Sequence, residues 1–201
     1  LGALYVLTHL ESKTDHECFF HDCVAERMSY AQLRKRIAEI APDVVGITSF
    51  TVGLVDVCMT AEIVRELFPE THICLGGHHP IAYPKEAAEL PQFDSIVVGE
   101  GEIVFTELVE RLSKGEDFTD IRGVYTGQSI KSHLETPIRD KRFLARVTIP
   151  SAYVDEIDDL PIVNRKFIRH LKYQNILGVT DDLATILSSR GCPYQCTFCD
   201  V

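Results

Sequence analysis

Short apolar runs alternate along the chain with longer segments whose apolar residues recur every three or four positions. The runs at 44–48, 72–75 and 95–98 are almost continuously apolar, which is typical of strands that a parallel sheet buries on both faces. Helical spacing follows each run, and proline or glycine marks where each helix should stop. We expect these helices to stop at Pro69, Pro91 and Gly115.

The N-terminal part of the chain predicts two helices and a strand. Apolar residues at helical spacing predict a helix over residues 1–12. Residues 17–22, centred on a Cys-Phe-Phe sequence, are predicted to form a short strand. Ser29 and Gln32 have the spacing of a capping box, so a second helix should begin there and close at Pro42.

Strands that alternate with helices indicate right-handed βαβ units and an open, mostly parallel sheet. After residue 116 the pattern changes, and 121–125 with 129–131 predict the two strands of a small hairpin. Residues 155–159 are acidic and should form a solvated surface, whereas the apolar run 183–187 predicts the first strand of a second domain. We therefore expect a domain over 1–135, a linker over 136–182 and the start of another domain over 183–201.

Composition narrows the classes of partner. The 201 residues carry a net charge of −10, which argues against nucleic acid because phosphate binding needs clustered Lys and Arg. No apolar run approaches the roughly 20 residues that cross a bilayer, and no secretory signal is visible. The chain has 7 cysteines, an odd count. This usage fits the reducing cytoplasm and does not resemble the disulfide framework of a secreted protein. Four of them are expected to be small buried apolar side chains: Cys18, Cys23, Cys58 and Cys74.

Loops rich in glycine and small polar residues follow the predicted strands, at 49–53, 76–79 and 99–102. In an open parallel sheet, ligands bind beyond the carboxyl ends of the strands, where such loops converge. Glycine lets backbone approach a bulky ligand closely, and a following helix offers free N–H donors. Each loop alone can be ordinary turn chemistry. Together they predict a ligand edge, and the absence of dinucleotide and P-loop motifs disfavours those ligands.

The end of the sequence carries cysteines in the spacing C-x3-C-x2-C, namely Cys192, Cys196 and Cys199. Thiols this close together in a Gly/Pro loop favour a metal site over a packing role. Thiolates are natural ligands of iron–sulfur clusters, and three of them leave one iron of a [4Fe-4S] cluster open. Zinc is the competing metal, but structural zinc sites normally use C-x2-C pairs with a fourth ligand, and no second pair lies nearby. Inert thiols are the remaining alternative.

This spacing, with Phe198 just before the last cysteine, resembles the signature of the radical S-adenosylmethionine (SAM) superfamily. In that family the open iron chelates SAM, and one electron cleaves the sulfonium to give a 5′-deoxyadenosyl radical. The resemblance implies a [4Fe-4S] cluster on Cys192, Cys196 and Cys199 and a SAM cofactor beside Phe198. It also implies a small-molecule substrate and an electron donor protein.

The upstream residues resemble the cobalamin (B12)-binding domain that precedes the radical SAM barrel in one large subfamily. The matching segments are 42–49, 75–80 and 98–102. The resemblance implies an α/β fold, with a Rossmann-like (flavodoxin-like), doubly wound parallel sheet of the B12-binding type followed by the start of a radical SAM (β/α) barrel. The residues implied to enclose the nucleotide tail of cobalamin are Ser49, Thr51, Gly76, Gly77, His78, Gly99, Glu100 and Gly101.

The ends of the chain carry a further expectation. The family's first, central strand and the loop with its axial histidine should precede Leu1, so no axial cobalt ligand is assigned. His78 or His79 in principle reaches cobalt, although a histidine beside a Gly-Gly turn more often caps backbone or faces solvent. We expect residues 1–201 to be a fragment that is inactive by itself, because most of the SAM pocket would lie downstream.

Three functions remain open. In the first, the chain is the N-terminal fragment of a cobalamin-dependent radical SAM enzyme, either methyltransferase-like or magnesium-protoporphyrin cyclase-like, which transfers a methyl group or closes a ring. In the second, the enzyme is the same but the front domain binds no cobalamin and serves as a docking or substrate module. In the third, the chain is a cobalamin carrier or sensor without catalysis, against which the cysteine loop argues.

Overall fold

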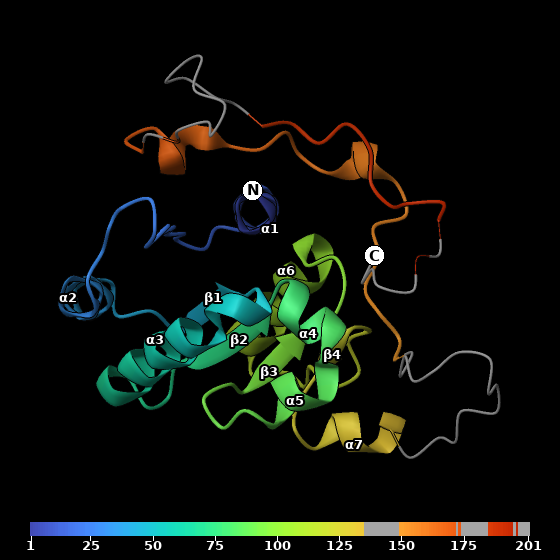
Figure 1. The fold of residues 1–201 in the computed structure, drawn as a ribbon, viewed down its shortest axis with the longest axis horizontal. Coiled ribbons are helices and arrows are strands. Elements are labelled where there is room, and N and C mark those ends of the chain that lie inside the picture. The colour runs from blue at the N-terminus through green and yellow to red at the C-terminus, as the bar shows by residue number, and fades with distance from the viewer. Residues whose placement is uncertain (135–148, 172, 174–184, 195, 197–201) are drawn as a thin grey trace.

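The computed structural model describes residues 1–134, 149–171, 173, 185–194 and 196 (Figure 1). They form an α/β fold in which helices cover both faces of a 4-stranded sheet. The elements in chain order are α1 (Gly2–Lys13), α2 (Tyr30–Ile40), β1 (Val44–Thr48), η1 (Thr51–Gly53), α3 (Leu54–Leu67), β2 (His72–Gly76), α4 (His78–Ala82), α5 (Pro84–Glu89), β3 (Ser95–Val97), α6 (Glu102–Lys114), β4 (Val124–Tyr125), α7 (Ser129–Leu134), η2 (Ile157–Asp159) and η3 (Arg165–Ile168).

The helix boundaries follow the signals in the sequence. The Ser29 side chain accepts a hydrogen bond from the backbone N–H of Gln32, and the Gln32 side chain accepts one from the N–H of Ser29. This capping box opens α2, as predicted. Gly115 adopts a left-handed conformation at the C-terminal cap of α6, where glycine has no Cβ to clash. The predicted N-terminal helix is α1, and α3 ends before Pro69.

The strand order is β1-β2-β3-β4, with the first three strands parallel and β4 antiparallel to β3. Thr48 at the end of β1 pairs with Gly76 at the end of β2. The carboxyl ends of these strands therefore lie side by side. The loops that leave β1, β2 and β3 consequently open at one edge of the sheet, which is where open α/β sheets bind ligands.

Alternating side chains of the central strands feed two separate cores. Ile73, Leu75 and Ile96 point into the larger core, which contains residues of α2, α3 and α5. Cys74 and Val97 point the other way, into a smaller core built on α6. Helix α1 packs outside α6. The sheet is thus wound on both faces, as expected for this class of fold.

One predicted strand forms but is less buried than expected, and another predicted strand is absent from the described residues. The run 44–48 does form β1, but Gly46 and Thr48 are exposed instead of buried. Among the described residues, β1 pairs only with β2, so its other edge lacks the neighbour that would bury it. Residues 17–22 form no strand, because no described strand lies beside them to complete a hydrogen-bonded ladder.

The predicted hairpin was also wrong. Val124 pairs with Val97 of β3 rather than with the residues that come after it. The N–H of Ser129 donates to Oγ1 of Thr126 at 3.1 Å, and the N–H of Thr126 donates to Oγ of Ser129 at 2.8 Å. This reciprocal pair caps the start of α7, and Ile130 is then fully buried. A local helix cap therefore replaces the second strand.

The described part of the segment expected to be a linker packs along the first domain, as the orange trace in Figure 1 shows. Ala152 extends the end of β3, because its N–H donates to the carbonyl of Val98 and its carbonyl accepts from the N–H of Glu100, both at 2.9 Å. The N–H of Asn164 donates to Oγ1 of Thr8 on α1 at 3.0 Å. Residues 155–159 are exposed, as predicted.

The predicted strand at 183–187 lies only partly within the described residues. Residues 185–187 form no strand, and the side chain of Ile186 is 74% exposed. An apolar run stays in a strand only when a neighbour pairs with it, and no described strand does so here. Within the described ranges, no helix is long and apolar enough to cross a bilayer.

Candidate functional site

The loops after β1 and β2 form one unit through their backbones. The N–H of Ser49 donates to the carbonyl of Gly76 at 2.9 Å, and the carbonyl of Ser49 accepts from the N–H of His79 at 3.0 Å. Gly77 has a φ of +92°, and a Cβ there would lie 2.6 Å from Oγ1 of Thr48. A Cβ on Gly76 would meet nothing within 4 Å. Gly77 thus lets the two loops approach, whereas Gly76 borders open space.

The two histidines of the second loop lie in different surroundings. The ring of His78 stacks on the ring of Phe50 with 4.7 Å between centroids. The His79 side chain is fully buried, and its Nδ1 lies 3.1 Å from Oγ1 of Thr51. Its Nε2 is buried without a hydrogen-bond partner. Such an unpaired buried polar atom costs about 1–3 kcal/mol, and it is uncommon in folded proteins.

Apolar side chains beside these loops face solvent. Phe50 is 63% exposed, Val52 96% and Val55 76%, and all three lie within the loop after β1 or the first turn of α3. Grouped exposed apolar side chains are typical of a binding surface. The first two loops therefore combine open space at Gly76, an unpaired buried nitrogen on His79 and an apolar rim. This combination fits a large, partly apolar cofactor.

The third loop, residues 99–102 after β3, is surrounded by other segments of the protein. Gly99 has a φ of +106°, and a Cβ there would lie 2.2 Å from the carbonyl oxygen of Ala152. Oε2 of Glu100 accepts a hydrogen bond from the N–H of Val154 at 2.5 Å. A Cβ on Gly101 would lie 3.1 Å from the side chain of Val6 on α1. These glycines thus let other segments of the same chain come close to the loop.

The carboxylates of Glu100 and Glu102 both bind the guanidinium of Arg190. Arg190 was not among the functional residues that the sequence predicted. Its Nη1 donates to Oε1 of Glu100 at 3.0 Å and its Nη2 to Oε1 of Glu102 at 2.6 Å. The guanidinium also lies over the ring of Tyr5, 5.2 Å from its centroid. The hydrogen bond to Glu102 is the main cause that raises the pKa of Arg190. The sequence did contain a hint of this contact, because an arginine precedes the cysteine motif and two glutamates follow the strand predicted at 95–98.

The cysteine motif lies partly within the described residues. Cys192 and Cys196 are exposed free thiols. Cys199 and Phe198 lie outside the described residues, so the three-thiolate site stays a prediction. Among the residues that are described, no three His, Cys, Asp or Glu side chains come together as a metal site.

The upstream cysteines are free thiols, and the expectation that all four are buried was correct only for Cys74. Cys74 is buried as predicted, and burial raises the pKa of its thiol to about 12. Cys18, Cys23 and Cys58 are only half-buried, and their partial burial is the main cause that raises the pKa of each. These neutral thiols are poor metal ligands, because the thiolate is the ligating form.

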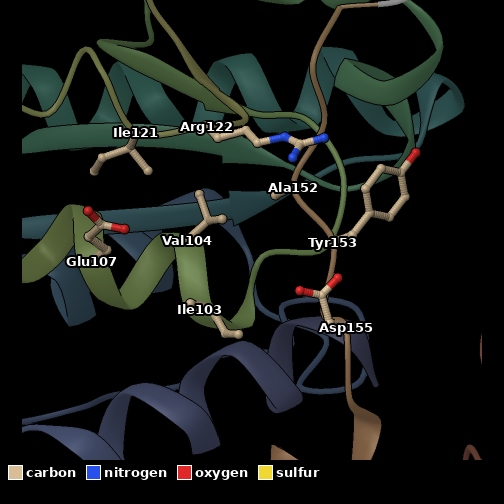
Figure 2. A pocket seen from close by; sticks show the side chains of 8 residues that line it. All are labelled: Ile103, Val104, Glu107, Ile121, Arg122, Ala152, Tyr153 and Asp155. Atoms are coloured by element: carbon tan, nitrogen blue, oxygen red, sulfur yellow. The ribbon is translucent and has the colours of Figure 1, made fainter.

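A pocket of about 240 Å³ lies between α6 and the segment 152–155 (Figure 2). Ile103, Val104 and Glu107 of α6 line it on one side, and Arg122 reaches it from the turn before β4. None of its lining side chains holds a buried polar atom without a partner.

Comparison with known proteins places these features in a family. A family profile described as the B12 binding domain matches residues 1–109. The chain is 30% identical over 200 residues to an uncharacterized methyltransferase of Pyrococcus horikoshii, covering 99% of this chain and 40% of that protein. It is 28% identical over 203 residues to the anaerobic magnesium-protoporphyrin IX monomethyl ester cyclase of Rubrivivax gelatinosus, covering 97% and 33%. The chain thus spans less than half the length of these relatives.

A solved structure shares the fold. TsrM, a radical SAM methyltransferase from Kitasatospora setae solved with cobalamin and a [4Fe-4S] cluster bound, superposes with a TM-score of 0.54 at 26% identity. The match covers 61% of this chain and 23% of TsrM. The expected B12-binding type of α/β fold, and the resemblance to cobalamin-dependent radical SAM proteins, are both confirmed.

Proposed function

The chain belongs to the B12-binding domain family, and from that membership we propose that it is part of a cobalamin-dependent radical SAM enzyme. It binds cobalamin at the edge formed by loops 49–53 and 76–79 and supplies three thiolates to a [4Fe-4S] cluster. The reaction is methyl transfer or ring-forming oxidation of a small-molecule substrate. The names of two relatives, a methyltransferase and a cyclase, support this pair of reactions.

The observation that carries the proposal is the unpaired Nε2 of His79 in a buried site at the ligand edge. It lies in the loop that begins with Gly76, where added side-chain atoms would meet open space. The exposed rings and methyl groups of Phe50 and Val52 border the same edge. A cobalamin brings both polar groups and a broad apolar surface, so it satisfies all of these features together.

The first two loops provide the contacts. Thr51, His78 and His79 offer hydroxyl and imidazole groups to the nucleotide tail, and Gly76 leaves room for it. Ser49 and Gly77 hold the two loops together through backbone contacts. In the third loop, Gly99, Glu100 and Gly101 border the cofactor edge, but the chain's own contacts fill their immediate surroundings.

The cysteine loop provides the second cofactor site. Cys192, Cys196 and Cys199 hold the cluster, with Phe198 beside SAM and an electron donor protein as partner. When bound, cobalamin supplies a transferable methyl group, and the cluster with SAM supplies radical chemistry. The proposal retains the domain boundaries at 135 and 182 and a cytoplasmic location.

Reconstitution tests both cofactors in the full-length protein. Hydroxocobalamin should change its absorption spectrum on titration and stay with the protein through gel filtration. Anaerobic iron and sulfide should give a brown protein. A Cys192→Ala, Cys196→Ala, Cys199→Ala variant should lose the brown colour and keep hydroxocobalamin, because only the cluster uses these thiols.

The matched control is a Cys18→Ala, Cys58→Ala variant, since these thiols lie upstream of the motif and are half-buried. It should keep both cofactors. A triple variant that retains the colour refutes the cluster assignment. A wild-type protein that takes up the cluster but no hydroxocobalamin favours the cobalamin-free docking module instead.

A further inference from the structure

The guanidinium of Arg190 joins the two halves of the proposed two-cofactor site. Its Nη1 and Nη2 donate to separate carboxylates, Glu100 at 3.0 Å and Glu102 at 2.6 Å. Arg190 lies in the segment before the cysteines, while Glu100 lies in the loop after β3 and Glu102 begins α6. Residues almost ninety positions apart in the sequence therefore meet at the ligand edge.

The contact is shielded from water, unlike an ordinary surface ion pair. The Arg190 side chain is 18% exposed, that of Glu100 24% and that of Glu102 only 5%. Charge-assisted hydrogen bonds from one guanidinium to two acceptors are strong, and removing one partner of a desolvated pair is costly because it leaves an unpaired buried charge. Exposed ion pairs contribute little by comparison.

Each acid has a stabilising influence besides Arg190. Oε2 of Glu100 accepts the N–H of Val154, and the N–H of Glu100 donates to the carbonyl of Ala152. Glu102 lies in the first turn of α6, where the helix dipole favours a negative charge. The two acids thus present their carboxylates at the end of the sheet, and the guanidinium of Arg190 binds both.

Arg190 is separated from Cys192 only by Gly191, which has a φ of +79° and turns the chain. Anchoring the guanidinium consequently restricts where Cys192 can lie. The anchor is the end of β3, the same edge at which loops 49–53 and 76–79 open. A cluster ligand is therefore tied directly to the cofactor edge of the sheet.

We propose that Arg190, Glu100 and Glu102 form a latch that positions the cysteine loop against the cofactor edge of the sheet. The proposal rests on the function proposed above and reassigns Glu100 from a cobalamin contact to a positioning residue. Glu102 and Arg190 act in the same way, through Cys192 rather than on a reacting group. Opening the latch should loosen the cluster loop while leaving the loops after β1 and β2 intact.

Limited trypsin digestion of the full-length protein tests the latch without any cofactor. Trypsin cleaves after Arg190 only when the guanidinium leaves the acids, so the cleavage rate reports the open population. In Glu102→Gln or Glu100→Gln we expect cleavage after Arg190 to be about tenfold faster, because charge-assisted hydrogen bonds are lost. Cleavage after Arg169, which is exposed, is the internal reference and should not change.

The matched control is Glu66→Gln, which removes the acidic partner of Arg34 in an exposed ion pair between α2 and α3. It should leave cleavage after Arg190 at the wild-type rate. If Glu102→Gln misfolds, cleavage after Arg169 will rise as well, and Glu100→Gln then decides. Wild-type rates after Arg190 in properly folded acid variants refute the latch.

The reconstituted protein provides a spectroscopic test of positioning. Arg190→Lys and Glu102→Gln should give the same altered electron paramagnetic resonance spectrum of the reduced cluster with SAM. The double variant should change it no further, because both substitutions open one latch. Glu66→Gln should match the wild type, and hydroxocobalamin retention should stay within about twofold in every variant.

The failures of the two proposals are distinguishable. If Glu100→Gln abolishes hydroxocobalamin retention and leaves trypsin cleavage unchanged, Glu100 is a cobalamin contact and the latch is refuted. If the wild type takes up neither cofactor, the proposed function fails, while trypsin cleavage after Arg190 still decides whether the latch exists.

Discussion

The glycine loops at the ligand edge have similar sequences and opposite surroundings. Beside Gly76, added side-chain atoms would meet open space and the neighbouring His79 holds an unpaired buried nitrogen. Beside Gly99, the carbonyl of Ala152 occupies the position that a Cβ would take. Glu100 and Glu102 in that loop are paired with Arg190. The region at Gly76 therefore has room beside its backbone, whereas the region at Gly99 is occupied by the protein's own chain.

This difference shows that glycine at the end of a strand has more than one physical purpose. A missing Cβ lets something come close, and the sequence does not say whether that is a cofactor or another segment of the protein. For the third loop, the partner comes from segments much later in the chain, at residues 152 and 190. Substitutions in the two regions should consequently have different effects on stability and on cofactor binding.

The largest expected effect separates Gly99 from Gly76. Gly99→Ala should lower the free energy of unfolding by roughly 3 kcal/mol, because it combines a strained positive φ with a clash against backbone. Gly76→Ala should change it by less than about 1 kcal/mol and should weaken hydroxocobalamin binding about tenfold by filling ligand space. Urea unfolding and absorbance titration measure the two quantities. Equal destabilisation by both substitutions would contradict the comparison.

A smaller effect is expected at His79. In His79→Phe the unpaired buried nitrogen disappears, which offsets the lost hydrogen bond with Thr51, so stability should change by less than about 1 kcal/mol. Hydroxocobalamin binding should weaken about tenfold, the equivalent of one hydrogen bond. The exposed His170 offers the control, since His170→Phe should leave affinity unchanged. Undiminished affinity in His79→Phe would remove this residue from the cofactor site.

The smallest effect is a pH dependence in the region of the third loop. His9 lies 2.8 Å from Thr106 of α6, and its pKa is lowered from 6.5 by burial and by Lys13, against an opposing effect of Glu102. The unfolded chain therefore binds the proton first, so stability present above pH 6.5 should be lost as the pH falls below it.

Unfolding midpoints of wild type and His9→Gln between pH 7.5 and about 5 would measure this slope. The slope should be shallower in His9→Gln, and the matched surface variant His170→Gln should keep the wild-type slope. Identical slopes in all three proteins would show that His9 does not titrate with folding.

Local signals in the sequence determined much of the fold. The Ser29 and Gln32 capping box, the stop before Pro69 and the cap at Gly115 depend on neighbours within a single turn, so residue identity suffices to place them. The strand runs also predicted that the three loops open at one edge, because the carboxyl ends of parallel strands lie at the same side of a sheet. Local signals also gave one wrong prediction. The residues expected to form a hairpin turn and its second strand instead cap helix α7 through Thr126 and Ser129.

The tertiary structure decided what each part of the edge contacts. The glycines and acids of the third loop were correctly placed at the ends of the strands, but their partners, Ala152 and Arg190, come from distant segments. The exposure of β1 likewise depends on which strands lie beside it. Long-range contacts of this kind depend on how the whole chain packs, because loop composition specifies backbone freedom and charge but not the group that approaches. The sequence alone thus predicted the α/β fold and the shared edge of the three loops, and only the packing showed that the loop at 99–102 contacts Ala152 and Arg190.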